Sequence, residues 1–183
     1  MRIIYEDNHL IVIDKEAGLL TQEDHTGAPN LYEMVKQYIK ETCHKPGNVY
    51  LGMVHRLDRP VSGVILFART SKAARRLSGS FRERTVGKIY AAVVHDAPGV
   101  PECSWIDREE RIQRRRGYSE IVDDHEERGK PARLRLYRAG AAEGKALLLV
   151  SLLTGKKHQI RAQLAAMDMP VAGDRRYGSP LAT

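Results

Sequence analysis

The sequence predicts an α+β fold, in which a mixed, mostly antiparallel sheet carries flanking helices. Runs rich in β-branched and aromatic residues outnumber the helix-like segments, the two kinds of segment are intermixed along the chain, and short links typical of hairpins recur. A chain of 183 residues is long enough to bury a core. It is also short enough for one domain, so we expect residues 1–183 to form a single domain.

The first half of the chain is expected to place two helices among short strands. Two β-rich runs separated by Glu6-Asp7-Asn8 predict a hairpin, and Asn30 is a suitable N-cap for a helix with one apolar face. A second helix is expected to begin at Ser71, with Ala74, Leu77 and Phe81 on one face. The expected strands are 3–5, 10–14, 49–54 and 64–68, and 55–63 is expected to be a polar turn.

The second half is expected to contain longer strands and one short helix. Arg133 and Arg135 alternate with apolar residues, which predicts a half-buried strand with a basic outer face. Segment 97–130 is polar and contains several prolines and glycines, so we expect a long excursion or a mobile loop. The remaining expected elements are strands 88–94 and 145–153 and a helix over 158–167, with Ile160, Leu164 and Met167 inward.

Charge and cysteine content narrow the possible partners and the compartment. Lys and Arg total 30 against 23 Asp and Glu, which gives a formal net charge of +7 and indicates a polyanionic partner. The two cysteines, Cys43 and Cys103, are too few for a disulfide scaffold. Acidic residues follow the first strand directly, which argues against a secretory signal, and every apolar run is too short to cross a membrane. We therefore expect a cytoplasmic protein.

Several common enzyme motifs are absent from the sequence. Gly155-Lys156 is followed by Lys157 and lacks the earlier glycine of a phosphate-binding loop. His125-Glu126 lacks the second histidine of a zinc protease, and Cys43-His44 has no further ligands nearby. No serine lies in a nucleophile elbow. The absence of these motifs argues against a metal-dependent or nucleotide-dependent enzyme.

Residues 52–63 carry the strongest chemical signal in the chain. A strand runs into a tight turn in which the carboxylate of Asp58 lies between Arg56 and Arg59, and nearby arginines favour its ionised form. From composition alone, a plain turn aspartate held by local charges is the better explanation of this pattern.

Four segments in a fixed order form one larger pattern. The first is residues 10–20 with Asp14-Lys15 and Ala17-Gly18, and the second is His55-Arg56-Leu57-Asp58 followed by Ser62-Gly63. Lys88-Ile89-Tyr90-Ala91 and residues 153–161, which end at Arg161, complete the set. Together these segments resemble the motifs of the RluA family of pseudouridine synthases. The match runs from residue 3 to residue 177. Glu16, Val61 and Lys156 depart from the usual pattern, and none of them replaces a catalytic group.

The resemblance implies a pseudouridine synthase fold with a central catalytic cleft. It also implies a minimal member of the family: a catalytic domain without an S4-type RNA-binding domain. The chain is expected to end before the last helix and strand with which family members usually complete the sheet. The implied partner is a stem-loop of ribosomal or transfer RNA, bound by a monomer without an obligatory protein partner.

The resemblance also assigns roles to individual residues. Asp58, Tyr90 and Arg161 are the implied catalytic residues, with Asp58 as the essential carboxylate and Arg161 paired to it. Tyr90 is expected to stack on the base and to serve proton transfer. No metal or other cofactor is implied. The implied RNA-binding residues are Arg56, His55, Arg59 and Lys15, of which Arg56 occupies the space left by a flipped base. Two basic clusters are candidates for phosphate contacts: Arg111, Arg114, Arg115 and Arg116, and Arg82, Arg84 and Lys88.

Two other functions remain open on the sequence alone. A catalytically inactive module of the same fold could bind and fold RNA without chemistry, although Asp58, Tyr90 and Arg161 are all present. A base-excising glycosylase also flips bases and uses a carboxylate, but the four motifs argue against it. Release of tritium from uracil C5 separates the three functions, because only bond formation at C5 expels that hydrogen.

Overall fold

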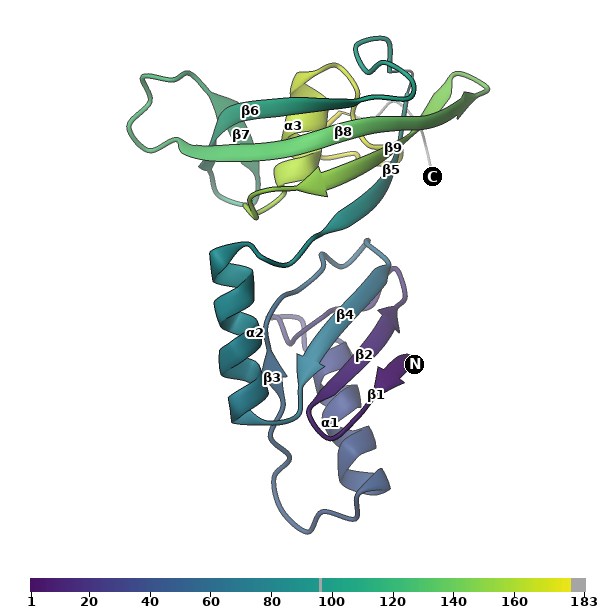
Figure 1. Cartoon of the computed structure of the whole chain (residues 1–183), viewed down its shortest axis with the longest axis vertical. Coiled ribbons are helices and arrows are strands. Elements are labelled where there is room, and N and C mark those ends of the chain that lie inside the picture. Colours follow the sequence, from purple (N-terminus) through teal and green to yellow (C-terminus); the bar gives the residue numbers. More distant parts are fainter. Residues whose placement is uncertain (96, 179–183) are drawn as a thin grey trace. The chain divides into compact units, whose positions relative to one another are not determined.

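A computed structural model describes residues 1–95 and 97–178. The chain divides into two compact units, Met1–Thr85 and Val86–Thr183, which we call the N-terminal unit and the C-terminal unit. In the described residues, the N-terminal unit combines a sheet of antiparallel neighbours with α1 and α2, and the C-terminal unit combines a second such sheet with α3 (Figure 1). The α+β class and the antiparallel pairing predicted from the sequence are confirmed. The expectation of one catalytic domain over residues 1–183 stays a prediction.

The N-terminal unit builds a sheet with the strand order β1-β2-β4-β3. All neighbouring strands pair antiparallel, and β2 pairs with β4 along its whole length. Asn30 caps α1 as expected, because its side chain accepts a hydrogen bond from the N–H of Glu33. The elements are β1 (Arg2–Glu6), β2 (Leu10–Lys15), α1 (Leu31–Thr42), β3 (Gly52–Met53), β4 (Gly63–Ala68) and α2 (Ser71–Glu83).

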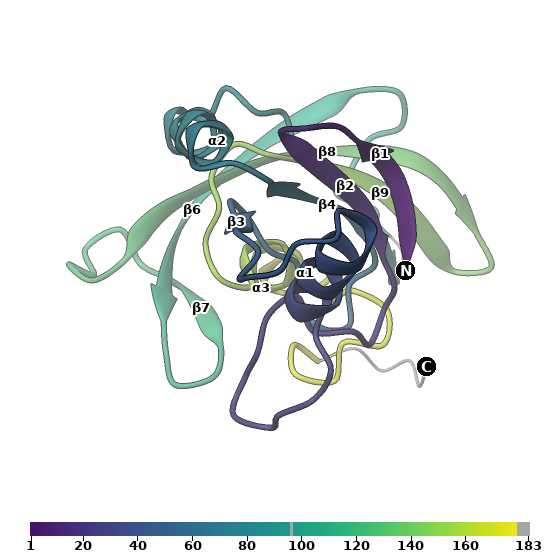
Figure 2. The ribbon, with the colours of Figure 1, turned by 90° about the horizontal axis from the view of Figure 1, so that it is seen from below.

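The two helices of the N-terminal unit lie on different sides of its sheet (Figure 2). α1 covers the face on which Ile11, Ile13, Ile65 and Phe67 are completely buried. α2 approaches β3 so closely that a Cβ on Gly52 would lie 2.7 Å from the Cβ of Ala74. A glycine is therefore required where α2 crosses the strand that leads into the predicted turn 55–63.

The C-terminal unit builds a longer sheet with the strand order β5-β9-β8-β6-β7. All its neighbouring strands are antiparallel. A two-residue loop joins β8 to β9, and both of its residues, Glu143 and Gly144, have positive φ, as a tight hairpin of matching twist requires. The elements are β5 (Ile89–His95), β6 (Trp105–Arg114), β7 (Ser119–Val122), β8 (Lys130–Ala142), β9 (Lys145–Leu152) and α3 (Gln159–Ala166).

The expectation of a long excursion or mobile loop over 97–130 is wrong. Residues 105–114 and 119–122 of this segment form β6 and β7, and β6 pairs with β8 along eight positions. β6 can form a strand although it is polar, because its acidic residues pair with arginines on β8. Asp107 accepts from Arg135 at 3.1 Å, and Glu109 accepts from Arg133 at 2.9 Å. Cross-strand ion pairs of this kind support a sheet without apolar alternation on that face.

α3 packs on one face of the C-terminal sheet (Figure 1). Leu164 is completely buried among β-strand residues, and Ile160 and Met167 pack at the edge of the same cluster, as the sequence predicts. Gln159 and Gln163 are buried as well and use their amides to bind backbone carbonyls of β8. Within residues 1–95 and 97–178, the helices lack the combined length and apolar character needed to cross a bilayer.

Candidate active site

Asp58 lies half-buried in the loop that joins β3 to β4. Thr21 holds this loop just before Asp58: its hydroxyl donates to the carbonyl of Leu57 at 2.7 Å and accepts from the Leu57 N–H at 3.3 Å. Gly18 holds it just after Asp58, because its N–H donates to the carbonyl of Arg59 at 2.8 Å. The Nε of Arg59 returns a hydrogen bond to the carbonyl of Gly18 at 3.0 Å. The carboxylate is therefore carried by a loop fastened on both sides.

Lys15 also holds this loop in place, from the interior of the N-terminal unit. Its side chain is completely buried at the end of β2, and its ammonium donates to the carbonyls of Glu16 at 2.9 Å, Leu19 at 2.8 Å and Arg59 at 3.3 Å. Burial lowers the pKa of the Lys15 amino group, while the negative charge of Asp58 acts in the opposite direction. The placement favours a structural role for Lys15 over the RNA contact predicted from the sequence.

The three other predicted RNA-binding residues differ in their exposure and in their contacts within the protein. His55 accepts a hydrogen bond at Nε2 from the N–H of Leu66 at 3.0 Å, and its ring stacks on Phe81 with centroids 5.0 Å apart. Arg56 and Arg59 are exposed beside Asp58. The two arginines are therefore placed at the surface of the loop, whereas His55 joins the loop to β4 and α2.

Tyr90 lies on β5, opposite Val150 of β9. It is half-buried and packs against the main apolar cluster of the C-terminal unit. Packing against this cluster restricts the movement of the Tyr90 side chain.

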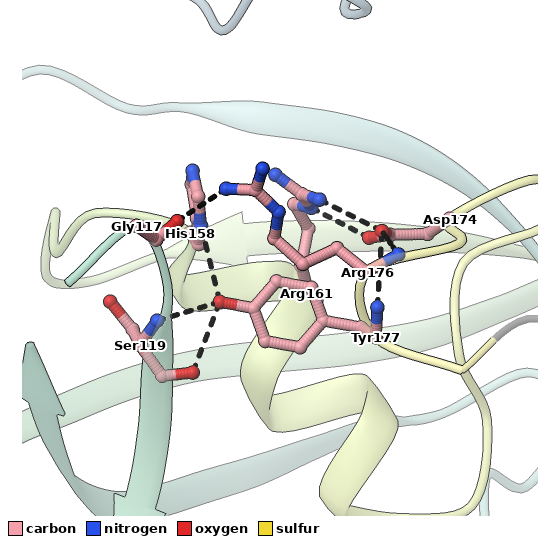
Figure 3. A network of polar contacts seen from close by, with 7 residues as sticks. All are labelled: Gly117, Ser119, His158, Arg161, Asp174, Arg176 and Tyr177. Atoms are coloured by element: carbon pink, nitrogen blue, oxygen red, sulfur yellow. Dashed lines mark hydrogen bonds and ion pairs between the residues drawn. The ribbon is translucent and has the colours of Figure 1, made fainter. Parts of the chain in front are cut away.

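Arg161 projects from α3 into a network of polar side chains (Figure 3). Its Nε donates to Oδ2 of Asp174 at 2.6 Å, and its Nη2 donates to Oδ1 of the same carboxylate at 2.8 Å. The guanidinium also lies over the ring of Tyr177, 4.8 Å from its centroid. Only 21% of the Arg161 side chain and 8% of the Asp174 side chain are exposed, so water screens this ion pair weakly.

Asp174 also shapes the segment that follows α3. Its Oδ1 accepts hydrogen bonds from the N–H groups of Arg176 at 3.2 Å and Tyr177 at 3.3 Å. Burial raises the pKa of the Asp174 carboxyl. The hydrogen bonds and the positive charge of Arg161 lower this pKa, and so do the hydrogen bonds from the two N–H groups; together they lower it by more than burial raises it. The net pKa lies below the usual value, and Asp174 stays ionised in the folded protein at neutral pH.

Tyr177 joins this network to the β6–β7 hairpin (Figure 3). Its hydroxyl accepts from the N–H of Ser119 at 2.8 Å, donates to the carbonyl of Ser119 at 3.0 Å, and lies 3.1 Å from Nδ1 of His158. All three contacts are satisfied together when His158 carries its hydrogen on Nδ1. Arg176 adds a hydrogen bond to the carbonyl of Gly117 in the same hairpin.

The structure separates the predicted basic clusters into paired and exposed members. Arg111 donates to the carbonyls of Glu126 and Gly129, and Arg115 pairs with Glu120. Arg82 and Arg84, at the end of α2, are exposed. Contacts to phosphate therefore fit Arg82 and Arg84 better than Arg111.

The candidate catalytic residues come from both units: Asp58 from the N-terminal unit, and Tyr90 and Arg161 from the C-terminal unit. The pairing of Asp58 with Arg161 stays a prediction. Sequence reasoning missed Thr21 and Gly18 as supports of the loop, and it missed Asp174 and Tyr177 as partners of Arg161. The sequence did contain a signal for Asp174 and Tyr177: the dipeptides Gly173-Asp174 and Tyr177-Gly178 place an acidic and an aromatic residue shortly after α3.

Comparison with known proteins assigns the chain to a family. Residues 9–166 match the family model described as RNA pseudouridylate synthase, which covers most of the chain. The chain belongs to the RNA pseudouridylate synthase family. The predicted resemblance is thereby confirmed, and all four segments that carry it lie within this range.

Two relatives show how far the family match extends. The chain is 33% identical to Dual-specificity RNA pseudouridine synthase RluA of Salmonella typhimurium, over 97% of this chain and 77% of that protein. It is 35% identical to Ribosomal large subunit pseudouridine synthase D of Nitrosomonas europaea, over 97% of this chain and 50% of that protein. Almost the whole of this family member therefore aligns with curated synthases.

Solved structures confirm the pseudouridine synthase fold. Human RNA Pseudouridylate Synthase Domain Containing 4 matches with a TM-score of 0.82 at 24% identity, over 100% of this chain and 72% of the human one. Human RNA Pseudouridylate Synthase Domain Containing 1 matches with a TM-score of 0.75 at 23% identity, over 98% and 70%. Because the sequence identities are below 25%, these structural matches establish the fold alone.

Proposed function

We propose that the protein isomerises specific uridines of ribosomal or transfer RNA to pseudouridine. In this reaction the N1–C1′ bond breaks, the uracil turns, and C5 bonds to C1′ while N1 gains a proton and C5 loses one. Nothing is oxidised and no group is brought in, so the reaction requires no cofactor. The observation that carries the proposal is the fastened loop that presents Asp58 in a chain of this family.

Asp58 is the proposed reactive carboxylate. As the glycosidic bond breaks, positive charge develops at C1′, and an ionised carboxylate either attacks that carbon or stabilises the charge. Either role requires the carboxylate to be held in place, because a misplacement of about 1 Å can slow a reaction about 100-fold. Thr21, Gly18 and Lys15 supply that constraint through the neighbouring backbone groups.

Tyr90 and Arg161 are proposed to assist Asp58. The Tyr90 ring stacks on the uracil and retains the base after cleavage, and its hydroxyl serves the transfer of the proton from C5. Arg161 pairs with Asp58 and orients its carboxylate. A planar guanidinium suits this task because it binds a carboxylate with two parallel hydrogen bonds.

The RNA is proposed to bind with its target base turned out of the stack. Unstacking costs a few kcal/mol, which contacts to the displaced strand must offset. Arg56 is exposed next to Asp58 and would fill the vacated space, while Arg59 and His55 contact the nearby backbone. The partner is a stem-loop of ribosomal or transfer RNA.

The protein is proposed to act as a cytoplasmic monomer without an obligatory protein partner. Cys43 and Cys103 are both exposed free thiols, which suits a reducing compartment. The +7 net charge supplies attraction to RNA without a partner subunit.

Tritium release tests the proposed function directly. In vitro transcripts of ribosomal and transfer RNA, labelled with tritium at uracil C5, are expected to lose label with the natural chain. Asp58→Asn keeps the shape of the side chain but removes its charge, so release is expected to fall below detection while RNA still binds. The matched control is Asp14→Asn, a half-buried carboxylate on β2 whose Oδ2 lies 3.5 Å from Nη1 of Arg2. RNA binding without release by the natural chain would instead indicate the inactive RNA-binding module.

The role of Arg161 calls for a second pair of variants. Arg161→Ala is expected to slow release strongly, and Arg161→Lys is expected to restore only part of the rate, because lysine offers a point charge in place of a planar fork. A rate for Arg161→Lys equal to that of the natural chain would contradict the orientation of Asp58 by two parallel hydrogen bonds.

A further inference from the structure

We propose that Asp174 and Tyr177 are positioning residues for Arg161. They hold its guanidinium in one orientation, Asp174 by binding one edge and Tyr177 by covering one face. The inference rests on the proposed function, in which Arg161 orients the reactive carboxylate. It adds two residues, from the segment after α3, that act on the reaction only through Arg161.

The ion pair with Asp174 uses one particular edge of the guanidinium. Its two hydrogen bonds come from Nε and Nη2, which form the side edge. The end edge, made of Nη1 and the second hydrogen of Nη2, does not take part in this fork. Asp174 can therefore hold the side edge while a different carboxylate binds the end edge, and the direction of the end edge is fixed as a result.

Tyr177 limits the remaining freedom of the guanidinium, which is rotation out of its plane. The ring centroid lies 4.8 Å from Cζ of Arg161, within the range of a cation–π contact. The ring is itself anchored, because the hydroxyl of Tyr177 binds the N–H and carbonyl of Ser119. Asp174 contributes to this as well, since it binds the N–H of Tyr177 and so shapes the turn between them.

The segment that carries both residues is attached to the C-terminal sheet. The N–H of Ala172 donates to the carbonyl of Val93 at 2.7 Å, and Val171 forms an antiparallel bridge with Val94. Gly173 then turns the chain with a positive φ of 77°. Positioning residues are effective when they stand on a rigid element, and here that element is β5, the strand of Tyr90.

A test of the geometry that does not depend on activity uses nitrogen-15-labelled arginine. The Nε–H resonance of Arg161, identified by its loss in Arg161→Lys, is expected to be sharp and slow to exchange with solvent. In Asp174→Asn it is expected to exchange at least about tenfold faster. The matched control is Glu6→Gln, which breaks a comparable ion pair, Arg69–Glu6 at 2.6 Å, in the N-terminal unit. An unchanged Arg161 resonance in Asp174→Asn would overturn the proposal whether or not the protein is a synthase.

The kinetic test separates the chemical step from binding. In single-turnover tritium release with saturating enzyme, Asp174→Asn is expected to lower the rate by roughly 10- to 100-fold, while its dissociation constant for RNA changes less than about threefold. Glu6→Gln is expected to keep the natural rate. Equal slowing by both variants would show a general loss of stability and overturn the proposal.

A double variant tests whether Asp174 acts through Arg161. If it does, Asp174→Asn combined with Arg161→Lys is expected to be little slower than Arg161→Lys alone. Multiplied effects would mean independent action and overturn the proposal.

Tyr177 needs its own pair of variants, because its ring and hydroxyl do different things. Tyr177→Phe and Tyr177→Leu both lose the hydroxyl, but only the first keeps a ring beside Arg161. The single-turnover rate of Tyr177→Leu is expected to be at least about threefold below that of Tyr177→Phe. Equal rates would remove Tyr177 from the proposal.

Discussion

The completely buried ammonium of Lys15 donates to three backbone carbonyls, two at Glu16 and Leu19 and one at Arg59 in the Asp58 loop. A lysine is seldom buried, since its charge loses hydration, and the hydrogen bonds offset that loss. The sequence pattern singled out Lys15 and Asp58 in two separate segments. It did not show that Lys15 points inward, because burial of a side chain depends on where residues 16–19 and 59 fold around it.

Replacing Lys15 with methionine is expected to destabilise the protein. Methionine has a similar length but no donor, so the carbonyls of Glu16 and Leu19 lose their partner, at a cost of about 1–3 kcal/mol. Urea unfolding measures this change. The control is Lys36→Met on α1, where the ammonium forms a surface pair with Glu33 at 3.3 Å and less than about 0.5 kcal/mol is expected. Similar losses at both positions would contradict the structural role of Lys15.

Asp174 is expected to make stability depend on pH in the acid range. Its folded pKa is lowered, chiefly by Arg161 acting against burial, so the folded state binds its proton less readily than the unfolded state. The stabilisation is complete above the unfolded pKa of about 3.9 and is lost as the pH falls through the lower folded pKa. The difference in free energy of unfolding between the natural chain and Asp174→Asn is therefore expected to shrink between pH 5 and pH 3. A difference that grows over that range would contradict the ion pair.

At the scale of elements, the β6–β7 hairpin shows why polar strands escape sequence analysis. Runs rich in apolar and β-branched residues located β2, β4, β5 and β9, and apolar alternation located β8, because the inward residues of these strands are hydrophobic. β6 has charged residues on one face, and only the partner strand β8 reveals that these charges are paired. The same limit applies to Asp174: its distance from Arg161 is set by the turn at Gly173 and the bridge to β5, neither of which is visible in a motif.

The hairpin is expected to loosen when Tyr177 loses its hydroxyl. In Tyr177→Phe the N–H and carbonyl of Ser119 lose their partner, so the Ser119 amide is expected to exchange its hydrogen with solvent at least about tenfold faster. Mass-resolved hydrogen exchange of residues 115–122 measures this. The control is Tyr118→Phe in the same hairpin, because the Tyr118 side chain is exposed and its hydroxyl only reaches Glu120, at 3.3 Å. Equal acceleration in both variants would contradict the anchoring role of Tyr177.

For the whole molecule, the net charge of +7 does not show which basic side chains can bind a partner, because some arginines are already paired with acidic residues. Arginines on the outer face of β8 are neutralised by acids on β6. In the described residues, no ion pair involves Arg82, which is exposed at the end of α2. Composition alone predicted a polyanionic partner correctly for this family, but it could not tell paired arginines from exposed ones, since pairing arises only when strands meet.

RNA binding is expected to weaken steeply as salt concentration rises. Each phosphate contact releases counterions, so the slope of log K against log salt becomes steeper by about 0.7–0.9 per contact. Arg82→Ala is expected to reduce the magnitude of the slope by about that amount, whereas Arg133→Ala, whose guanidinium pairs with Glu109, is expected to leave it unchanged. Filter binding between 50 and 200 mM salt gives both slopes. A flat plot for the natural chain would contradict binding through phosphates.

The fastening of the Asp58 loop by Thr21, Gly18 and Lys15 also bears on which uridines react. All three supports lie in the same unit as the loop, so the loop reaches its working geometry when that unit folds, before any RNA arrives. The slow rearrangement in an encounter then belongs to the RNA, whose base must leave the stack. Among otherwise similar stem-loops, we expect the protein to modify fastest the uridine that the RNA itself releases most readily.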